Sequence, residues 1–90
     1  MLSLCGVRTA KNYRDEQGVI AFGNRLREVR LKKGYSQERL ANEAGIASSQ
    51  ISRIETGEIN TSLSHICLLA RILKVEPKDL MDFKLTKQKD

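Results

Sequence analysis

Aromatic side chains are scarce in this chain, whose 90 residues include two Tyr, two Phe and no Trp. Proteins that read RNA or single-stranded DNA usually stack bases on aromatic side chains, so this composition disfavours both classes. The sequence also lacks a run of about 18 apolar residues, the length that a membrane-spanning helix needs. Residues 1–6 have too short an apolar run, with no basic region before it, for a secretory signal. We therefore expect no membrane partner.

Residues that bind metals or act as nucleophiles are equally few. The chain has one histidine, His65, and two cysteines, Cys5 and Cys67, which lie far apart in the sequence. It has no Cys-x-x-Cys pair, no quartet of His and Cys, and no glycine-rich phosphate loop. We expect no catalytic residue, metal, cofactor or small-molecule ligand, so the chain is not predicted to be an enzyme. Two separate thiols are typical of a reduced, cytoplasmic protein.

Basic residues outnumber acidic residues in this chain. The chain holds 16 Lys and Arg against 11 Asp and Glu, which gives a net charge of +5 and a pI near 9.5. Ninety residues form one small domain with a modest core. A basic domain favours a polyanionic partner, although ribosomal and membrane-surface proteins share this balance. Because aromatic residues are few, double-stranded DNA is the preferred partner.

Apolar residues recur at helical spacing, which predicts an all-α protein. Phe22, Leu26 and Val29 give residues 19–33 one apolar face. Another helix is expected over residues 61–73, with Asn60 as its N-cap. Its predicted buried stripe consists of Leu63, Ile66, Leu69, Ala70 and Leu73.

The two ends of the chain differ from its middle. Pro77 is suited to the first position of a short helix that ends near residues 81–82. Residues 1–18 lack apolar periodicity and are expected to form a partly ordered arm, and residues 84–90 form a charged tail. This leaves residues 19–83 as the folded domain.

Two short helices joined by a tight turn are predicted in the middle, over residues 37–44 and 48–55. Ser36 can cap the first helix, because its hydroxyl accepts a bond from a free backbone N–H. Gly45 follows the first helix, where a left-handed backbone conformation is common. This arrangement is a helix-turn-helix, in which the second helix enters the DNA major groove.

The second of these helices has two unlike faces. Ala47, Ile51 and Ile54 fall within a narrow arc and are expected to face the core. The candidate base-reading residues lie on the other side or its flanks, and they are Ser48, Ser49, Gln50, Ser52 and Arg53. Hydroxyls, an amide and a guanidinium suit base edges. On periodicity alone, an ordinary solvated face is an equally good interpretation.

Several motifs occur together in a fixed order, namely Gly34-Tyr35-Ser36-Gln37, Leu40-Ala41, Gly45-Ile46, Ile51-Ser52-Arg53-Ile54-Glu55 and Gly57. In this order they resemble the Cro/C1-type helix-turn-helix family of phage repressors and bacterial regulators. The similarity extends over residues 20–83. It implies a five-helix, lambda-repressor-like DNA-binding bundle with a central helix-turn-helix, usually homodimeric. Family members often carry Ser or Thr where this chain has Ala47, so Ser48 is the expected cap of the second helix.

The resemblance also implies roles for single residues. Arg30 is expected to face Glu55 in a partly buried ion pair that fixes the angle of the recognition helix. Gln37, with Asn60 and Thr61, matches positions that bind DNA phosphates. Other basic side chains are expected mainly to form a solvated face, and they are Arg25, Lys32, Lys33 and Arg39.

The end of the domain holds more apolar residues than one core face can absorb. We expect Leu80 to complete the core and the rest to form a homodimer interface, consisting of Ile72, Met81, Phe83 and Leu85. The predicted function is a homodimeric transcriptional regulator on a near-palindromic operator, resembling restriction–modification controllers and small prophage repressors. The alternative is an antitoxin-like protein that neutralises a toxin and autoregulates its operon.

Overall fold

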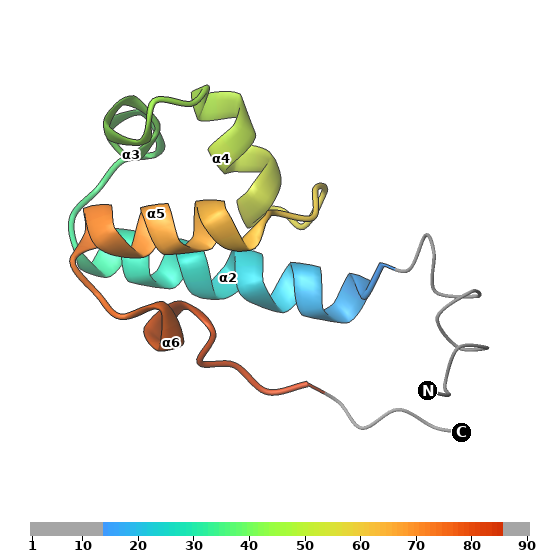
Figure 1. Ribbon diagram of the computed structural model, residues 1–90. Coiled ribbons are helices and arrows are strands. Elements are labelled where there is room, and N and C mark those ends of the chain that lie inside the picture. The colour runs from blue at the N-terminus through green and yellow to red at the C-terminus, as the bar shows by residue number, and fades with distance from the viewer. Residues whose placement is uncertain (1–13, 86–90) are drawn as a thin grey trace, which may run out of the picture.

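The computed structural model describes residues 14–85, and within them the chain is all-helical with no strand. The helices are α2 (Glu16–Lys32), α3 (Gln37–Ala44), α4 (Ser48–Glu55), α5 (Leu63–Leu73) and α6 (Pro77–Leu80). The short helices α3 and α4 lie on one side of α2 and α5, and α6 lies on the other side (Figure 1). Most of the predicted N-terminal arm and of the charged tail lies outside the described residues. None of the helices in residues 14–85 is long and apolar enough to cross a membrane.

Every helix contributes to one core. The largest fully buried side chains are Leu26, Leu40, Ile51, Ile54, Leu69, Leu73 and Leu80. Burying a leucine or isoleucine side chain stabilises a fold by about 1.5–3 kcal/mol. Because these residues come from five short elements, no helix can bury its apolar face without the others. Leu80 fills the core from α6, as the sequence predicted.

Local signals set the ends of the helix-turn-helix. The Ser36 hydroxyl accepts a hydrogen bond from the backbone N–H of Arg39 at 3.0 Å, so α3 begins at Gln37. Gly45 has φ +74°, a conformation that side chains with a Cβ rarely adopt, and it ends α3. The helices α3 and α4 have the predicted bounds.

The first long helix begins earlier than predicted. Asp15 accepts a hydrogen bond from the N–H of Gly18 at 3.0 Å, and α2 therefore starts at Glu16. Residues 16–18, predicted as part of the arm, are helical. The start of α2 is polar, so its apolar periodicity gave no sign of this extra turn.

The predicted N-cap of α5 is wrong. Ser62 caps the helix, with its hydroxyl accepting from the N–H of His65 at 3.2 Å, and Asn60 lies two residues before it. Leu63 is therefore the first helical residue, and 73% of its surface is exposed instead of buried. Serine and asparagine are almost equally good caps, so the local sequence did not separate them.

The last helix, α6, is a single turn. Pro77 stands at its first position, and the Asp79 carboxylate accepts from the N–H of Glu76 at 3.0 Å. The helix ends at Leu80, slightly before the predicted end. The chain after α6, residues 81–85, has no regular structure.

Candidate nucleic-acid interface

Close packing against α2 sets the position of α4. Gly23 is buried in the middle of α2, and a Cβ built there would lie 2.7 Å from the carbonyl oxygen of Glu55 and closer still to that of Ile54. Any larger residue would push the two helices apart. Sequence reasoning missed this residue, although an isolated glycine inside a helical pattern often marks a close approach.

A buried ion pair holds the end of α4. The Arg30 guanidinium donates to both oxygens of the Glu55 carboxylate, at 2.5 Å from Nε and 3.0 Å from Nη2. Both residues are 6% exposed. Arg30 also donates to the backbone oxygen of Tyr35 at 2.8 Å, and the Gln37 amide donates to Glu55 at 2.9 Å. The carboxylate at the end of α4 is thus tied to α2 and to the first residue of α3, as the sequence resemblance implied for Arg30.

Small polar groups and one free cation line the outer face of α4. Ser48, Ser49 and Arg53 are exposed, whereas Gln50 and Ser52 are half-buried on the flanks. Within residues 14–85, the Arg53 guanidinium has no hydrogen-bond or ion-pair partner. It can therefore bond a ligand without giving up a contact of the folded domain.

The N-cap of α4 differs from the prediction, although the bounds of the helix do not. Ala47, not Ser48, is the N-cap residue, and it offers no side-chain acceptor to the helix. Ser48 is the first helical residue, because the backbone of Ala47 is extended at φ −74° and ψ 143°. The first N–H groups of α4 therefore lack a side-chain cap. Such groups carry partial positive charge and favour anions.

The three candidate phosphate ligands have unlike surroundings. Gln37 is half-buried at the start of α3 and already braces Glu55 through one amide hydrogen. Asn60 is exposed in the loop before α5. The Thr61 hydroxyl oxygen is buried and has no hydrogen-bond partner among the described residues. Of the three side chains, those of Gln37 and Asn60 are the ones with polar groups at the surface.

Two of the four basic side chains that were expected to be simply solvated have partners within the fold. Arg39 lies over the Tyr35 ring, 4.1 Å from its centroid, and pairs with Glu43 at 3.2 Å. Arg25 is bound to the chain around α6, on the far side from α4 (Figure 1). Lys32 and Lys33 are exposed at the end of α2.

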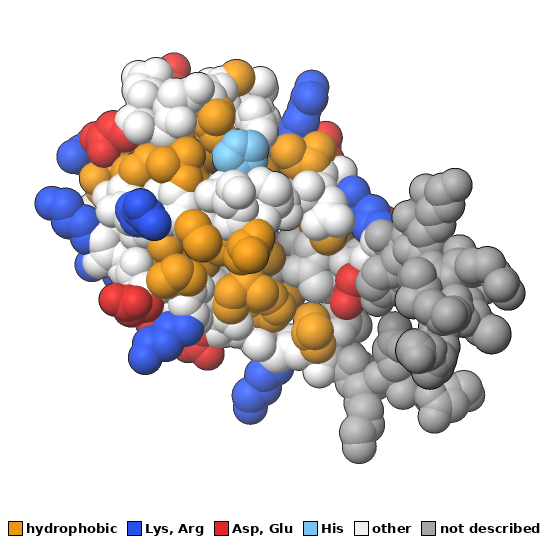
Figure 2. Space-filling view, viewed as in Figure 1, with side chains coloured by type: hydrophobic (Ala, Val, Ile, Leu, Met, Phe, Trp, Pro, Cys, Tyr) orange, Lys and Arg blue, Asp and Glu red, His pale blue; other side chains and the backbone are white. Residues whose placement is uncertain are grey.

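The four candidate dimer residues differ in how exposed they are. Met81 and Leu85 are 48% and 52% exposed, whereas Ile72 and Phe83 are partly buried against the core. Hydrophobic side chains gather on the face that α5 and the chain after α6 present to the viewer in Figure 2. Cys67 and Leu68 of α5 are half-buried and line a shallow hollow with Leu63. The apolar surface is thus wider than the four predicted residues.

Comparison with known proteins places this geometry in a family. The sequence profile described as helix-turn-helix matches residues 26–80. The control protein C.BamHI of Bacillus amyloliquefaciens is 45% identical over 65 residues, which cover 71% of this chain and 80% of that protein. The crystal structure of the restriction–modification controller protein C.AhdI from Aeromonas hydrophila has a TM-score of 0.67 at 45% identity, covering 69% of this chain and 94% of that one.

A second solved structure includes nucleic acid. The structure of SinR in complex with DNA has a TM-score of 0.62 at 35% identity, covering 68% of this chain and 98% of that one. A profile match over more than half of the chain and relatives of this similarity agree with the motifs and with the paired helices α3 and α4. The chain therefore belongs to the helix-turn-helix family of DNA-binding transcriptional regulators, a family of regulators and not of enzymes.

Proposed function

We propose that this chain binds a specific double-stranded DNA site through the outer face of α4 and regulates transcription as a homodimer. The observation that carries the proposal is the contrast on α4 between a free, exposed Arg53 and a Glu55 held by Arg30 and Gln37. The ion pair fixes the helix, and the free guanidinium is left to bond a base. A bidentate arginine–guanine contact contributes about 1–3 kcal/mol of discrimination.

The proposed reading surface consists of the five polar residues on α4 and its flanks, namely Ser48, Ser49, Gln50, Ser52 and Arg53. Phosphates on either side would be bound by Gln37 at the start of α3 and by Asn60 and Thr61 before α5. Because the Thr61 hydroxyl is buried, a phosphate would meet the backbone of this residue. Phosphate contacts of this kind orient the domain without reading sequence.

Two copies are needed for useful specificity, because one recognition helix reads only a few base pairs. In the homodimer, the interface would contain the exposed Met81 and Leu85 together with Ile72 and Phe83, which are partly buried against the core. The recognition helices of such dimers lie about 34 Å apart, one turn of DNA, so the operator is a near-palindrome.

Within the family, we propose a role like that of the restriction–modification controllers. The control protein C.BamHI and the restriction–modification controller protein C.AhdI are each 45% identical to this chain. In this role the regulator acts by occupying its operator in the cytoplasm, without a cofactor.

Selection of bound sites from random duplex DNA tests the proposal directly. The expected result is one enriched site with two inverted half-sites, whose centres lie about 10 base pairs apart. Footprinting on the selected site should protect both halves at the same protein concentration. Failure to enrich any sequence would contradict specific readout, and a single unrepeated half-site would contradict the homodimer. Co-purification of a second polypeptide that abolishes DNA binding would instead support the antitoxin-like alternative.

A further inference from the structure

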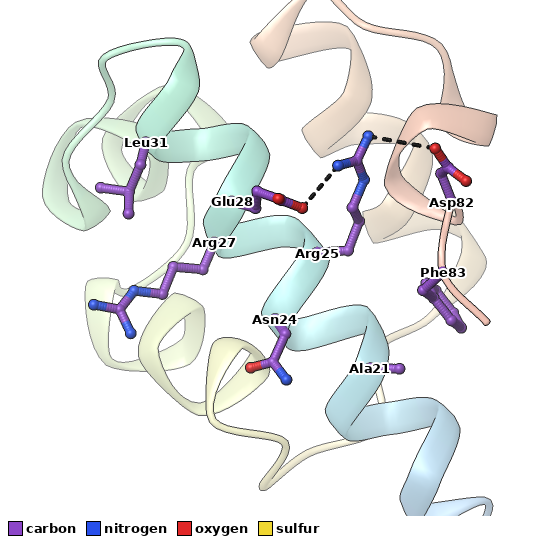
Figure 3. A pocket seen from close by; sticks show the side chains of 8 residues that line it. All are labelled: Ala21, Asn24, Arg25, Arg27, Glu28, Leu31, Asp82 and Phe83. Atoms are coloured by element: carbon purple, nitrogen blue, oxygen red, sulfur yellow. Dashed lines mark hydrogen bonds and ion pairs between the residues drawn. The ribbon is translucent and has the colours of Figure 1, made fainter. Parts of the chain in front are cut away.

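Arg25 joins α2 to the end of α6. Its Nε donates to the backbone carbonyl of Asp79 at 2.6 Å, and its Nη1 pairs with Glu28 on the next turn of α2 at 2.8 Å. Its Nη2 lies 3.8 Å from the Asp82 carboxylate. The side chain is 20% exposed. Figure 3 shows the guanidinium of Arg25 directed at the chain after α6.

The bond from Arg25 to the Asp79 carbonyl gives α6 a hydrogen-bond partner that this one-turn helix cannot supply itself. The last carbonyls of a helix have no partner within it, and α6 has four residues, so each of its carbonyls needs a partner from outside or from the turn that follows. Arg25 meets this need at Asp79 with a charge-assisted bond, which is stronger than a neutral one. The pair with Asp82 is longer, and Asp82 is 79% exposed, so salt screens this contact more than the bond to Asp79.

The chain that Arg25 holds carries most of the proposed dimer residues. Phe83 lies between two hollows, one shared with Arg25 and Asp82 and the other, of about 330 Å³, with Phe22 and Ile66. Met81 and Leu85 flank Phe83 in the sequence, each two residues away, and both side chains are about half exposed. A shift of residues 81–85 would therefore move the apolar groups that a partner must match.

We infer that Arg25 is a positioning residue for the homodimer: it fixes residues 81–85 against α2 and thereby shapes the surface that a second copy contacts. The inference rests on the homodimer of the proposed function. It assigns a role to a basic residue whose partners Asp79 and Asp82 lie in and just after α6, a helix on the other side of α2 and α5 from α4 (Figure 1).

The test compares Arg25→Met with Arg27→Met in the full-length chain. Both changes remove one guanidinium from α2 and keep an unbranched apolar stem. Arg27 is exposed, has no bonded partner in residues 14–85, and points away from the chain after α6 (Figure 3). The dimer dissociation constant is measured by sedimentation equilibrium. Losing a charge-assisted bond, which contributes about 1.5–3 kcal/mol, raises this constant only as far as it lowers the fraction of monomers with residues 81–85 in place. We therefore expect Arg25→Met to raise the constant about tenfold and Arg27→Met to leave it near the wild-type value.

Hydrogen exchange gives a second readout. The backbone N–H of Met81 is bonded to the carbonyls of Pro77 and Lys78, and that of Phe83 to the carbonyl of Met81. At protein concentrations where the chain is monomeric, these two amides should exchange faster in Arg25→Met, while amides in the middle of α2 and α5 keep their protection. Arg25→Lys, which keeps the charge but replaces the planar guanidinium with a single ammonium nitrogen, should fall between wild type and Arg25→Met and serves as the test variant if Arg25→Met does not fold.

The outcomes separate the two proposals. If the wild type dimerises and both methionine variants have its dissociation constant, the role of Arg25 is wrong and the homodimer stands. If the wild type remains monomeric, also on its operator, the homodimer is wrong and the role of Arg25 in it is lost too. Weaker dimerisation with faster exchange at Met81 and Phe83, in Arg25→Met alone, supports the inference.

Discussion

Arg30 and Arg53 carry the same guanidinium group in opposite surroundings. Arg30 is 6% exposed, and its guanidinium donates hydrogen bonds to the Glu55 carboxylate and to the backbone oxygen of Tyr35. Arg53 is exposed and has no partner among residues 14–85. Desolvating an ion pair costs about as much as the attraction between its charges returns, so the value of Arg30 lies in geometry more than in net stability. Arg53 has its bonding capacity left for a ligand.

Arg53→Ala should weaken binding to the selected operator by about 1–3 kcal/mol and relax the preference at one base pair in each half-site. On random duplex DNA the loss should be smaller, because only the phosphate contacts remain there. Both affinities are measured at one fixed salt concentration. Arg27→Ala is the control for lost positive charge and should change both affinities by the same small factor. Equal losses on the two DNAs for Arg53→Ala would make Arg53 a phosphate contact.

Glu55→Gln should destabilise the fold by about 3–5 kcal/mol, because it leaves the buried Arg30 charge without its counter-ion. Urea unfolding of the purified variant measures this loss. Glu43→Gln is the matched control: it breaks an exposed pair with Arg39 on α3 and should cost less than about 1 kcal/mol. Similar urea midpoints of unfolding for Glu55→Gln and Glu43→Gln would show that the buried pair does not stabilise the position of α4.

At the scale of elements, the recognition helix is positioned by its neighbours and not by its own sequence. The eight residues of α4 are too few to form a stable helix alone. Ile51 and Ile54 bury one face, Glu55 fixes the last turn, and Gly23 lets the backbone of α2 come close. In the proposed complex, the angle at which α4 would meet DNA is therefore a property of the packing between α2, α3 and α4.

Gly23→Ala tests this packing. The added methyl group would lie too close to the backbone oxygens of Ile54 and Glu55, and backbone cannot move aside as a flexible side chain can. We expect a loss of about 1–3 kcal/mol in the free energy of unfolding, measured by urea denaturation. Operator affinity, measured where the variant is still folded, should fall as well, because α4 is displaced.

Gly18→Ala is the control on the same helix. A Cβ at Gly18 meets the flexible Asp15 side chain, with its nearest atom at 3.2 Å, so this variant should be close to wild type in both measurements. A Gly23→Ala variant as stable and as tight-binding as Gly18→Ala would contradict the proposed close packing.

At the scale of the whole molecule, two surfaces lie on opposite sides of the bundle. The helices α3 and α4 form one, and the chain around α6 forms the other (Figure 1). This separation allows one copy to contact DNA and a second copy at the same time. It also means that a change in the proposed dimer surface need not alter the proposed reading surface.

Met81→Lys should give a folded monomer with much weaker operator binding, although the added positive charge favours DNA. Met81 is 48% exposed, so lysine can be accommodated without entering the core. Sedimentation at micromolar concentration measures the oligomeric state, and circular dichroism checks the fold. Phe83 is a poorer choice, because it packs against the core and a charge there would also disturb the fold.

Leu31→Lys is the control, since Leu31 is 56% exposed on α2 and lies outside the proposed interface. It should remain dimeric with unchanged operator affinity. A Met81→Lys variant that still dimerises like the wild type would place the interface elsewhere, and the half-buried residues Cys67 and Leu68 of α5 would be the next surface to test.

The sequence by itself determined the local parts of this protein. Ser36 and Gly45 act on their immediate neighbours through a hydroxyl and a left-handed backbone, so α3 and α4 could be predicted with their observed bounds. The burial of Leu80 and the pairing of Arg30 with Glu55 were likewise expected before the structure was known. The first was expected because some of the surplus apolar residues at the end of the domain should complete a small core, and the second because of the family resemblance.

Only the tertiary structure decided which of several locally equivalent residues has which role. Ser62 caps α5 instead of Asn60, and Arg25 has partners 54 and 57 positions along the chain while Arg27 has none among the described residues. Gly23 is fixed by the backbone of a helix some thirty residues away. These outcomes depend on contacts between distant segments. No pattern within one turn of helix encodes such contacts, because which segments meet is set by how the five helices of residues 14–85 share one small core.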